Sequence, residues 1–252
     1  MGAHGAPLQR NRFYLHNAGV ARVWVGTSGF SYREWKGTFY PDNLTSNEFL
    51  RYYASRFTSV EIDSTFYRMP TSKALETWRN ETPEAFRFTL KASQRITHRE
   101  RLRVPSEALQ YFTQTAATLK DRLGLVLYQL PPFFKYEAER LKAFLEVLPS
   151  DIHACMEFRH PSWFTSEVYL LLEKHKVALC IHDGDDGCSP LQITAARTCV
   201  RLRQAHYSEE AREQWRERWR DWSKSGLDVF AYIKHKDNPN APQIALDFAR
   251  GF

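Results

Sequence analysis

The sequence predicts a single (β/α)8 TIM barrel of the α/β class, and three observations support this prediction. Eight short segments rich in β-branched and aromatic residues alternate with longer amphipathic segments from residue 22 onward. Such an alternation produces parallel strands, and eight of them in about 250 residues are typical of a closed barrel. No linker rich in Pro, Gly or Ser divides the chain, so we expect residues 22–252 to form one domain.

Each predicted strand is a short β-rich run bounded by turn residues or charges. The strands are expected at residues 23–27, 59–63, 86–92, 124–130, 154–158, 177–182, 199–203 and 228–234. The open doubly wound sheet is the alternative, because GTSG at residues 26–29 could mimic a phosphate-binding turn. That segment lacks the spacing of a dinucleotide fingerprint, so the barrel is preferred.

The predicted helices follow the strands and lie near residues 46–56, 72–80, 106–121, 137–147, 165–175 and 208–223. Ser106 and Ser208 each precede Glu residues, as is typical of a helix N-cap. Trp215, Trp219 and Trp222 recur at helical spacing, which predicts a stripe that packs against the barrel.

The remaining features limit the class of protein. Residues 1–21 have scattered charges and no apolar core of a signal peptide, so we expect a flexible leader. No run approaches the roughly 18 apolar residues of a membrane helix. The four cysteines show no CxxC spacing, and three lie in apolar runs, which indicates reduced core thiols in a cytoplasmic protein. A net charge of +6 favours anionic partners.

Charged residues gather where the predicted strands end, the edge at which barrel enzymes place their chemistry. Strands 59–63, 154–158 and 199–203 alternate apolar and charged side chains, so the charged sets are expected to point into the mouth. The converging cations are Lys91, Arg159, Arg201 and Arg203, and the converging carboxylates are Glu61, Asp63, Glu157 and Asp183. Guanidinium groups suit phosphate or carboxylate oxygens, and paired carboxylates suit acid and base catalysis.

Several alternatives remain for these residues. A structural ion-pair network could account for them, and Lys91 could form a Schiff base. A zinc or manganese site is conceivable from Glu61, His98, Glu157, His160, His182 and Asp183, but no short ligand spacing supports it, so we expect no metal and no cofactor. Loop aromatics either stack on a sugar or base or cap the barrel; they are Phe39, Tyr40, Phe66, Tyr67 and Trp163.

Several motifs resemble, in order, the domain-of-unknown-function 72 (YecE-like) family. They are VGTSGFSYREWKGTFYP at residues 25–41, VEIDSTFYRMP at 60–70, FRFTLKASQRITH at 86–98, LYQLPPFFK at 127–135, MEFRHPSWF at 156–164 and VALCIHD at 177–183. The resemblance implies a TIM barrel of uncharacterised activity, similar in architecture to endonuclease IV-like barrels. Asp63 stands where the family usually has Asn, and Arg203 and Gln204 replace the usual His and Gly.

We therefore predict an enzyme, possibly an acid/base hydrolase or lyase, that acts on a phosphorylated or other anionic small molecule. The predicted catalytic residues are Glu61, Lys91, Glu157, His160 and Asp183, and the predicted substrate-binding residues are Ser28, Tyr67, Gln129, Arg159, Trp163, Arg201 and Arg203. The alternatives are a barrel that binds or processes nucleic acid and a non-catalytic ligand-binding barrel. We also expect Glu157 to matter more for activity than for folding, because water in an open mouth would solvate its partner cations.

Overall fold

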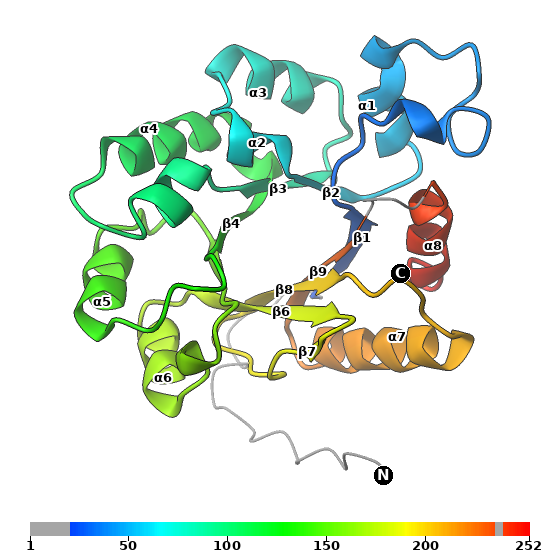
Figure 1. Cartoon of the computed structure of the whole chain (residues 1–252). Coiled ribbons are helices and arrows are strands. Elements are labelled where there is room, and N and C mark those ends of the chain that lie inside the picture. Colours follow the sequence, from blue (N-terminus) through cyan, green and yellow to red (C-terminus); the bar gives the residue numbers. More distant parts are fainter. Residues whose placement is uncertain (1–20, 235–238) are drawn as a thin grey trace.

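A computed structural model describes residues 21–234 and 239–252. Eight parallel strands form a nearly closed barrel in the order β1-β9-β8-β6-β5-β4-β3-β2 (Figure 1). Their bounds are β1 Val23–Thr27, β2 Ser59–Ile62, β3 Arg87–Lys91, β4 Leu123–Gln129, β5 Ala154–Glu157, β6 Ala178–Gly184, β8 Arg197–Leu202 and β9 Asp228–Ile233. The predicted barrel and all eight predicted strands are confirmed. The predicted leader lies outside the described residues except for Ala21.

Helices cover the outside of the barrel (Figure 1). They are α1 Phe49–Ala54, α2 Ser64–Tyr67, α3 Ser72–Asn80, α4 Glu107–Ala116, α5 Ala138–Glu146, α6 Ser166–Lys174, α7 Glu209–Lys224 and α8 Ala241–Phe248. All six predicted helices are present, and the Ser106 and Ser208 hydroxyls accept N–H groups of Leu109 and Ala211, as expected for N-caps. No helix of the described chain is long and apolar enough to cross a membrane.

The connection between β6 and β8 departs from the regular pattern. Residues 185–196 contain no helix; β7, Gly187–Cys188, turns back instead and pairs antiparallel with the end of β6. This hairpin was not predicted, because its second strand, β7, is only two residues long. In a regular (β/α)8 barrel the connection between these two strands contains a helix; here it is a hairpin followed by a loop.

The barrel closes between β1 and β2 with few backbone contacts. A single bridge joins Ser28 and Glu61, and the N–H of Gly29 donates to the Glu61 carbonyl at 2.7 Å. Below this bridge the Tyr53 hydroxyl accepts the N–H of Thr27 at 2.8 Å and donates to the carbonyl of Ser59 at 3.2 Å. A Cβ on Gly26 would lie 2.0 Å from that carbonyl oxygen, so glycine permits this close approach. The Tyr53 side chain of α1 thus links β1 to β2 where the two strands form few backbone hydrogen bonds with each other.

Strand alternation separates two sets of core residues. Val60, Ile62, Met156 and Phe158 belong to the large core between the strands and the helices, together with the buried tryptophans of α7. The smaller set fills the barrel interior: Trp24, Leu125, Leu127, Cys155, Ala178, Cys180, Cys199, Phe230 and Tyr232. Trp24 stacks on Phe230 at 4.6 Å near the N-terminal strand ends. The interior is therefore a packed core up to the level of the charged residues.

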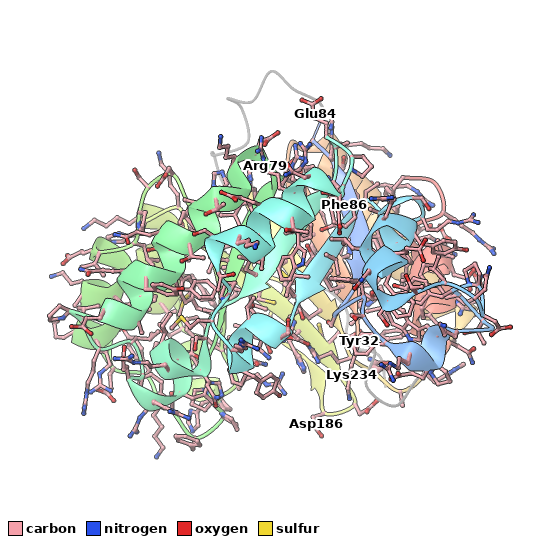
Figure 2. All side chains as sticks on the ribbon, turned by 90° about the horizontal axis from the view of Figure 1, so that it is seen from above. Tyr32, Arg79, Glu84, Phe86, Asp186 and Lys234 are labelled. Atoms are coloured by element: carbon pink, nitrogen blue, oxygen red, sulfur yellow. The ribbon has the colours of Figure 1, made fainter. Side chains whose placement is uncertain are left out.

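The two ends of the barrel are distinct. Figure 2 shows Tyr32, Asp186 and Lys234 at one end of the molecule and Glu84 and Phe86 at the other. Tyr32 lies in the loop after β1, and Lys234 directly follows β9, so their end is the C-terminal mouth of the barrel.

Candidate functional site

The center of the mouth is an ion-pair triad of Glu61, Arg201 and Glu157, contributed by β2, β8 and β5. Arg201 Nε and Nη2 donate to the two oxygens of Glu61, each at 2.7 Å, and its Nη1 donates to Glu157 Oε2. All three side chains are 0% exposed. The predicted inward orientation of these residues is correct, and the guanidinium is held on two sides by carboxylates.

Three further cations surround the triad and reach solvent; we call Lys91, Arg159 and Arg203 the outer cations. Arg159 Nη1 donates to Glu157 Oε1 at 2.9 Å, and Arg203 Nη2 lies 3.6 Å from Glu61 Oε1. Their side chains are 31% and 17% exposed, and Lys91 is 11% exposed. The buried carboxylates thus lie beneath cations that face the mouth.

Asp63 and Gln129 complete the contacts of this cluster. Asp63 Oδ1 lies 3.4 Å from Lys91 Nζ and 3.5 Å from Arg201 Nη2, and Gln129 Nε2 donates to Glu157 Oε1 at 2.8 Å. Lys91 Nζ also lies 4.5 Å from the center of the Phe66 ring, a favourable place for a cation.

The two triad carboxylates differ in pKa. Burial raises the pKa of Glu61 to about 7, although the charge of Arg201 opposes this effect. Burial would also raise the pKa of Glu157, but Arg201, Arg159 and the other groups around it together lower that pKa to about 2. At neutral pH Glu157 is therefore a carboxylate, whereas Glu61 can gain or lose a proton.

His182 and Tyr32 lie near the cluster and were not among the predicted catalytic or substrate-binding residues. His182 is half-buried; burial lowers the pKa of its imidazole, which Glu157 partly offsets. Burial and the charges of Asp63 and Glu61 raise the pKa of Tyr32, whose hydroxyl donates to the Ser28 carbonyl at 2.8 Å. The two-residue alternation from Cys180 could have placed His182 inside, whereas Tyr32 lies in a loop and carries no periodic signal.

Asp183 is not part of the cluster, and the expectation that it would be is wrong. Its Oδ1 accepts Gln204 Nε2 at 2.8 Å, and its Oδ2 accepts the Nε1 hydrogen of Trp215 on α7 at 3.1 Å. Because neighbouring residues of a strand face opposite sides, the inward position of His182 turns Asp183 outward.

Three other predicted site residues, Trp163, His160 and Tyr67, differ in burial and in contacts. Trp163 is fully buried, stacks on Phe158 at 4.6 Å and donates to the Phe134 carbonyl, so its position is that of a hydrophobic cap. His160 accepts the N–H of Ser162 through Nδ1 and caps the short 3-10 helix Pro161–Trp163. Tyr67 is 74% exposed.

The burial of the triad also affects the expectation for Glu157. That expectation required water beside its partner cations, but Arg201 is as buried as Glu157 itself. Only Arg159 is solvated enough to tolerate the loss of the carboxylate. A structural contribution of Glu157 is therefore larger than the sequence suggested.

Among the described residues, one group has the geometry of a metal-ligand cluster. The sulfur atoms of Cys155, Cys180 and Cys199 lie within 4.8 Å of one another inside the barrel. Burial raises the pKa of each thiol well above its usual value, so the protonated forms that pack as core residues are favoured. The conceivable His and carboxylate set does not form such a cluster in the described chain.

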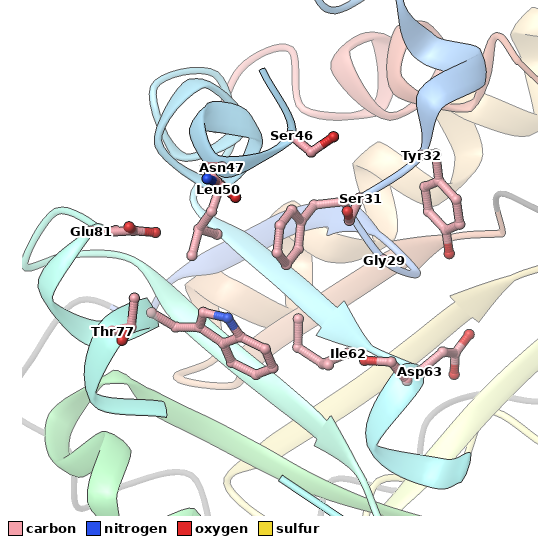
Figure 3. A pocket seen from close by; sticks show the side chains of 13 residues that line it. Gly29, Ser31, Tyr32, Ser46, Asn47, Leu50, Ile62, Asp63, Thr77 and Glu81 are labelled. Carbon is pink, nitrogen blue, oxygen red and sulfur yellow. The ribbon is translucent and has the colours of Figure 1, made fainter. Parts of the chain in front are cut away.

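Two cavities flank the mouth. The larger, which we call the side cavity, has a volume of about 640 Å³ and lies between the β1 and β2 ends and helices α1 and α3 (Figure 3). The second, of about 460 Å³, lies between the end of β6 and α7 and includes Asp183, Cys188 and Trp215.

The amino-acid sequence is similar to a protein family and to two curated proteins. A family model described as "Protein of unknown function DUF72" matches residues 24–252. The UPF0759 protein YunF of Bacillus subtilis is 31% identical to this chain over 156 residues, which cover 58% of this chain and 54% of YunF. The UPF0759 protein YecE of Escherichia coli K12 is 31% identical over 143 residues, which cover 56% of this chain and 50% of YecE. These matches span about half the length of either relative.

Solved structures are similar over most of the chain. A DUF72 family protein of Thermotoga maritima has a TM-score of 0.77 at 28% identity, covering 90% of this chain and 98% of its own. A DUF72 family protein of Enterococcus faecalis has a TM-score of 0.74 at 20% identity, covering 91% and 94%; this second likeness concerns the fold alone.

Proposed function

Since this chain belongs to the DUF72 family, whose description assigns no activity, we propose its function from the site itself: an enzyme that acts on a small anionic substrate, phosphorylated or carboxylated, at the C-terminal mouth. The observation that carries the proposal is the layering of charge. The triad carboxylates are 0% exposed, while the outer cations above them face solvent.

The charge balance supports an anionic ligand. Four cations, Lys91 and the three arginines, face the carboxylates of Glu61, Asp63 and Glu157. The cluster therefore carries a net charge of +1, or +2 when Glu61 is protonated. Arg203 Nε is in addition a buried donor without a hydrogen-bond partner in the described structure. An anion bound between Arg159 and Arg203 would supply that partner.

The pKa values suggest different tasks for the two carboxylates. Glu61, with a pKa of about 7, suits a proton donor or acceptor. Glu157, with a pKa of about 2, is too weak a base for that task, and it orients Arg201 and Arg159 instead. Arg203 makes only a 3.6 Å contact with Glu61 Oε1, and turning it toward a bound anion would open this oxygen to the mouth. Acid and base chemistry of a hydrolase or lyase then falls to Glu61.

Calorimetric titration with inorganic phosphate and pyrophosphate tests the binding step. We expect both to bind, and Arg159→Ala to weaken binding about tenfold or more, because one charge-assisted contact contributes about 1.5–3 kcal/mol. Lys142→Ala, at an exposed position of α5, is the matched control and should bind like the wild type. Absence of binding, or equal losses in both variants, would overturn the proposal.

Two further measurements separate the competing functions. Release of phosphate from a panel of phosphomonoesters, lost in Glu61→Gln, supports an enzyme, whereas binding of these esters without turnover of any substrate in the panel supports a ligand-binding barrel. A single-stranded oligonucleotide that binds more tightly than pyrophosphate, with an affinity that falls steeply with salt, would favour the nucleic-acid alternative.

A further inference from the structure

The side cavity opens beside the triad but differs from it in chemistry. The loop after β1 contributes Phe30 and Tyr32, and the short 3-10 helix Ser46–Glu48 before α1 contributes Asn47. Asp63 directly follows β2, and α3 contributes Trp78 and, at its C-cap, Glu81. Figure 3 shows Asp63 and Tyr32 at one end of the cavity and Glu81 with Thr77 at the other. A volume of about 640 Å³ is in the range of small-molecule sites.

The charge of the side cavity is opposite to that of the mouth. Its lining contains two carboxylates, Asp63 and Glu81, and no Lys, Arg or His among the described residues. An anionic group would be repelled by these carboxylates, whereas a hydroxyl can donate a hydrogen bond to them. The cavity therefore suits an uncharged part of a ligand that carries hydroxyl groups.

Aromatic and hydroxyl side chains share the lining. The Phe30 and Trp78 rings meet edge to face with centroids 6.5 Å apart, and both are half-buried. Ser31, Ser46, Ser64, Thr77 and the amide of Asn47 surround them. A sugar ring presents an apolar C–H face and hydroxyls at its edge, which matches aromatic rings surrounded by hydrogen-bonding groups.

Asp63 joins the side cavity to the anion site. The residue is part of the cavity lining, and its carboxylate lies 3.4 Å from Lys91 Nζ. A ligand that extends past Asp63 would thus place one end beside the outer cations and the other beside Trp78.

We propose that the side cavity binds the sugar ring of a sugar phosphate whose phosphate is held by the outer cations. This inference rests on the proposed function and names its substrate class. Binding of the ring beside Trp78 should make a sugar phosphate bind more tightly than phosphate itself.

The test is calorimetric titration with inorganic phosphate, glycerol phosphate and a panel of D-pentose and D-hexose phosphates. We expect at least one sugar phosphate to bind about tenfold more tightly than inorganic phosphate, the gain that an apolar contact and its hydrogen bonds commonly supply. Trp78→Ala and Glu81→Gln should each reduce this gain and leave the affinity for inorganic phosphate unchanged. Glu76→Gln, an exposed position of the same helix outside the cavity lining, is the matched control.

The outcomes separate the two proposals. If inorganic phosphate binds but no sugar phosphate binds more tightly, or if the gain survives both cavity variants, the sugar subsite is wrong and the anion site stands. A stronger gain for an amino sugar phosphate would mean that the cavity selects a cation, which also overturns the assignment to a neutral ring. If no anion binds, the proposed function is wrong, and the sugar subsite that rests on it is wrong as well. Because Trp78 also stacks on Phe88, Glu81→Gln keeps the test valid if Trp78→Ala does not fold.

Discussion

Arg201 holds both oxygens of Glu61 through separate nitrogens at 2.7 Å, although the two residues are 140 positions apart in the chain. The pair joins β8 to β2 across the barrel, and Glu157 binds the remaining guanidinium nitrogen. Since all three side chains are sealed from solvent, each depends on the others for compensation of its charge. This dependence leads to predictions for stability as well as for binding.

Arg201→Met should destabilise the protein strongly. Removing one partner of a buried ion pair costs about 3–5 kcal/mol, which corresponds to a fall in Tm of about 6–20 °C for a chain of this size. Arg159→Met is the control: Arg159 is 31% exposed, so its loss should cost about 1 kcal/mol or less. Thermal and urea melts measure both. Equal effects of the two substitutions would contradict a sealed triad.

Glu157→Gln should remove a source of acid sensitivity. The pKa of Glu157 is about 2 in the folded protein, below its usual range. Its contribution is therefore complete above about pH 4.5 and is lost as the pH falls toward 2. The difference in unfolding free energy between wild type and Glu157→Gln should shrink from pH 5 to pH 3. Gln114→Ala, at an exposed position of α4, removes no titratable group and should show a constant difference.

Glu61→Gln should show the opposite pH dependence. Because the folded pKa of Glu61 is about 7, above that of the unfolded chain, the folded protein binds more protons between about pH 4.5 and 7. Ionisation of Glu61 then lowers the stability of the wild type as the pH rises through this window. Urea melts should show Glu61→Gln gaining stability relative to wild type from pH 5 to 7.5. If the difference in stability between wild type and Glu61→Gln stayed constant over this range, Glu61 would have the same pKa in the folded and the unfolded chain, which contradicts the prediction.

Asp183→Ala should affect folding and leave anion binding intact. The substitution leaves the buried Nε1 hydrogen of Trp215 without its acceptor, at a cost of about 1–3 kcal/mol. Phosphate affinity should remain within about twofold of wild type, because Asp183 faces α7 rather than the outer cations. Loss of phosphate binding without a change in Tm would place Asp183 in the binding site after all.

The native protein should expose at most one thiol to an aromatic disulfide reagent. Cys155, Cys180 and Cys199 are buried, and Cys188 is exposed. Although the residue is exposed, partial desolvation of its thiol and the charge of Asp183 raise the pKa of Cys188 to about 11, so it should react more slowly than free cysteine. In denaturant four thiols should react. Fast modification of two or more thiols in native protein would show that the barrel interior is accessible.

Much of the fold could be predicted because its signals are local. Strand alternation in residues 59–63, 154–158 and 199–203 identified Glu61, Glu157 and Arg201 as inward residues, and each faces the interior as expected. The same alternation should have excluded Asp183, since His182 beside it takes the inward position. Tyr32 was missed because it lies in a loop, where no period marks the facing side.

The sequence by itself determined where the eight barrel strands and six of the helices form and which residues of β2, β5 and β8 point inward, because hydrophobic periodicity acts within a few residues. Only the tertiary structure decided which charges pair, how deeply they are buried and where the side cavity lies. The barrel must bring β2, β5 and β8 together before Arg201 can bind Glu61 and Glu157. Both carboxylates are desolvated, and the different charges around them, Arg159 beside Glu157 and Asp63 beside Glu61, then separate their pKa values. The physical reason is that desolvation and Coulomb energy depend on distances in space, which separation along the chain does not encode.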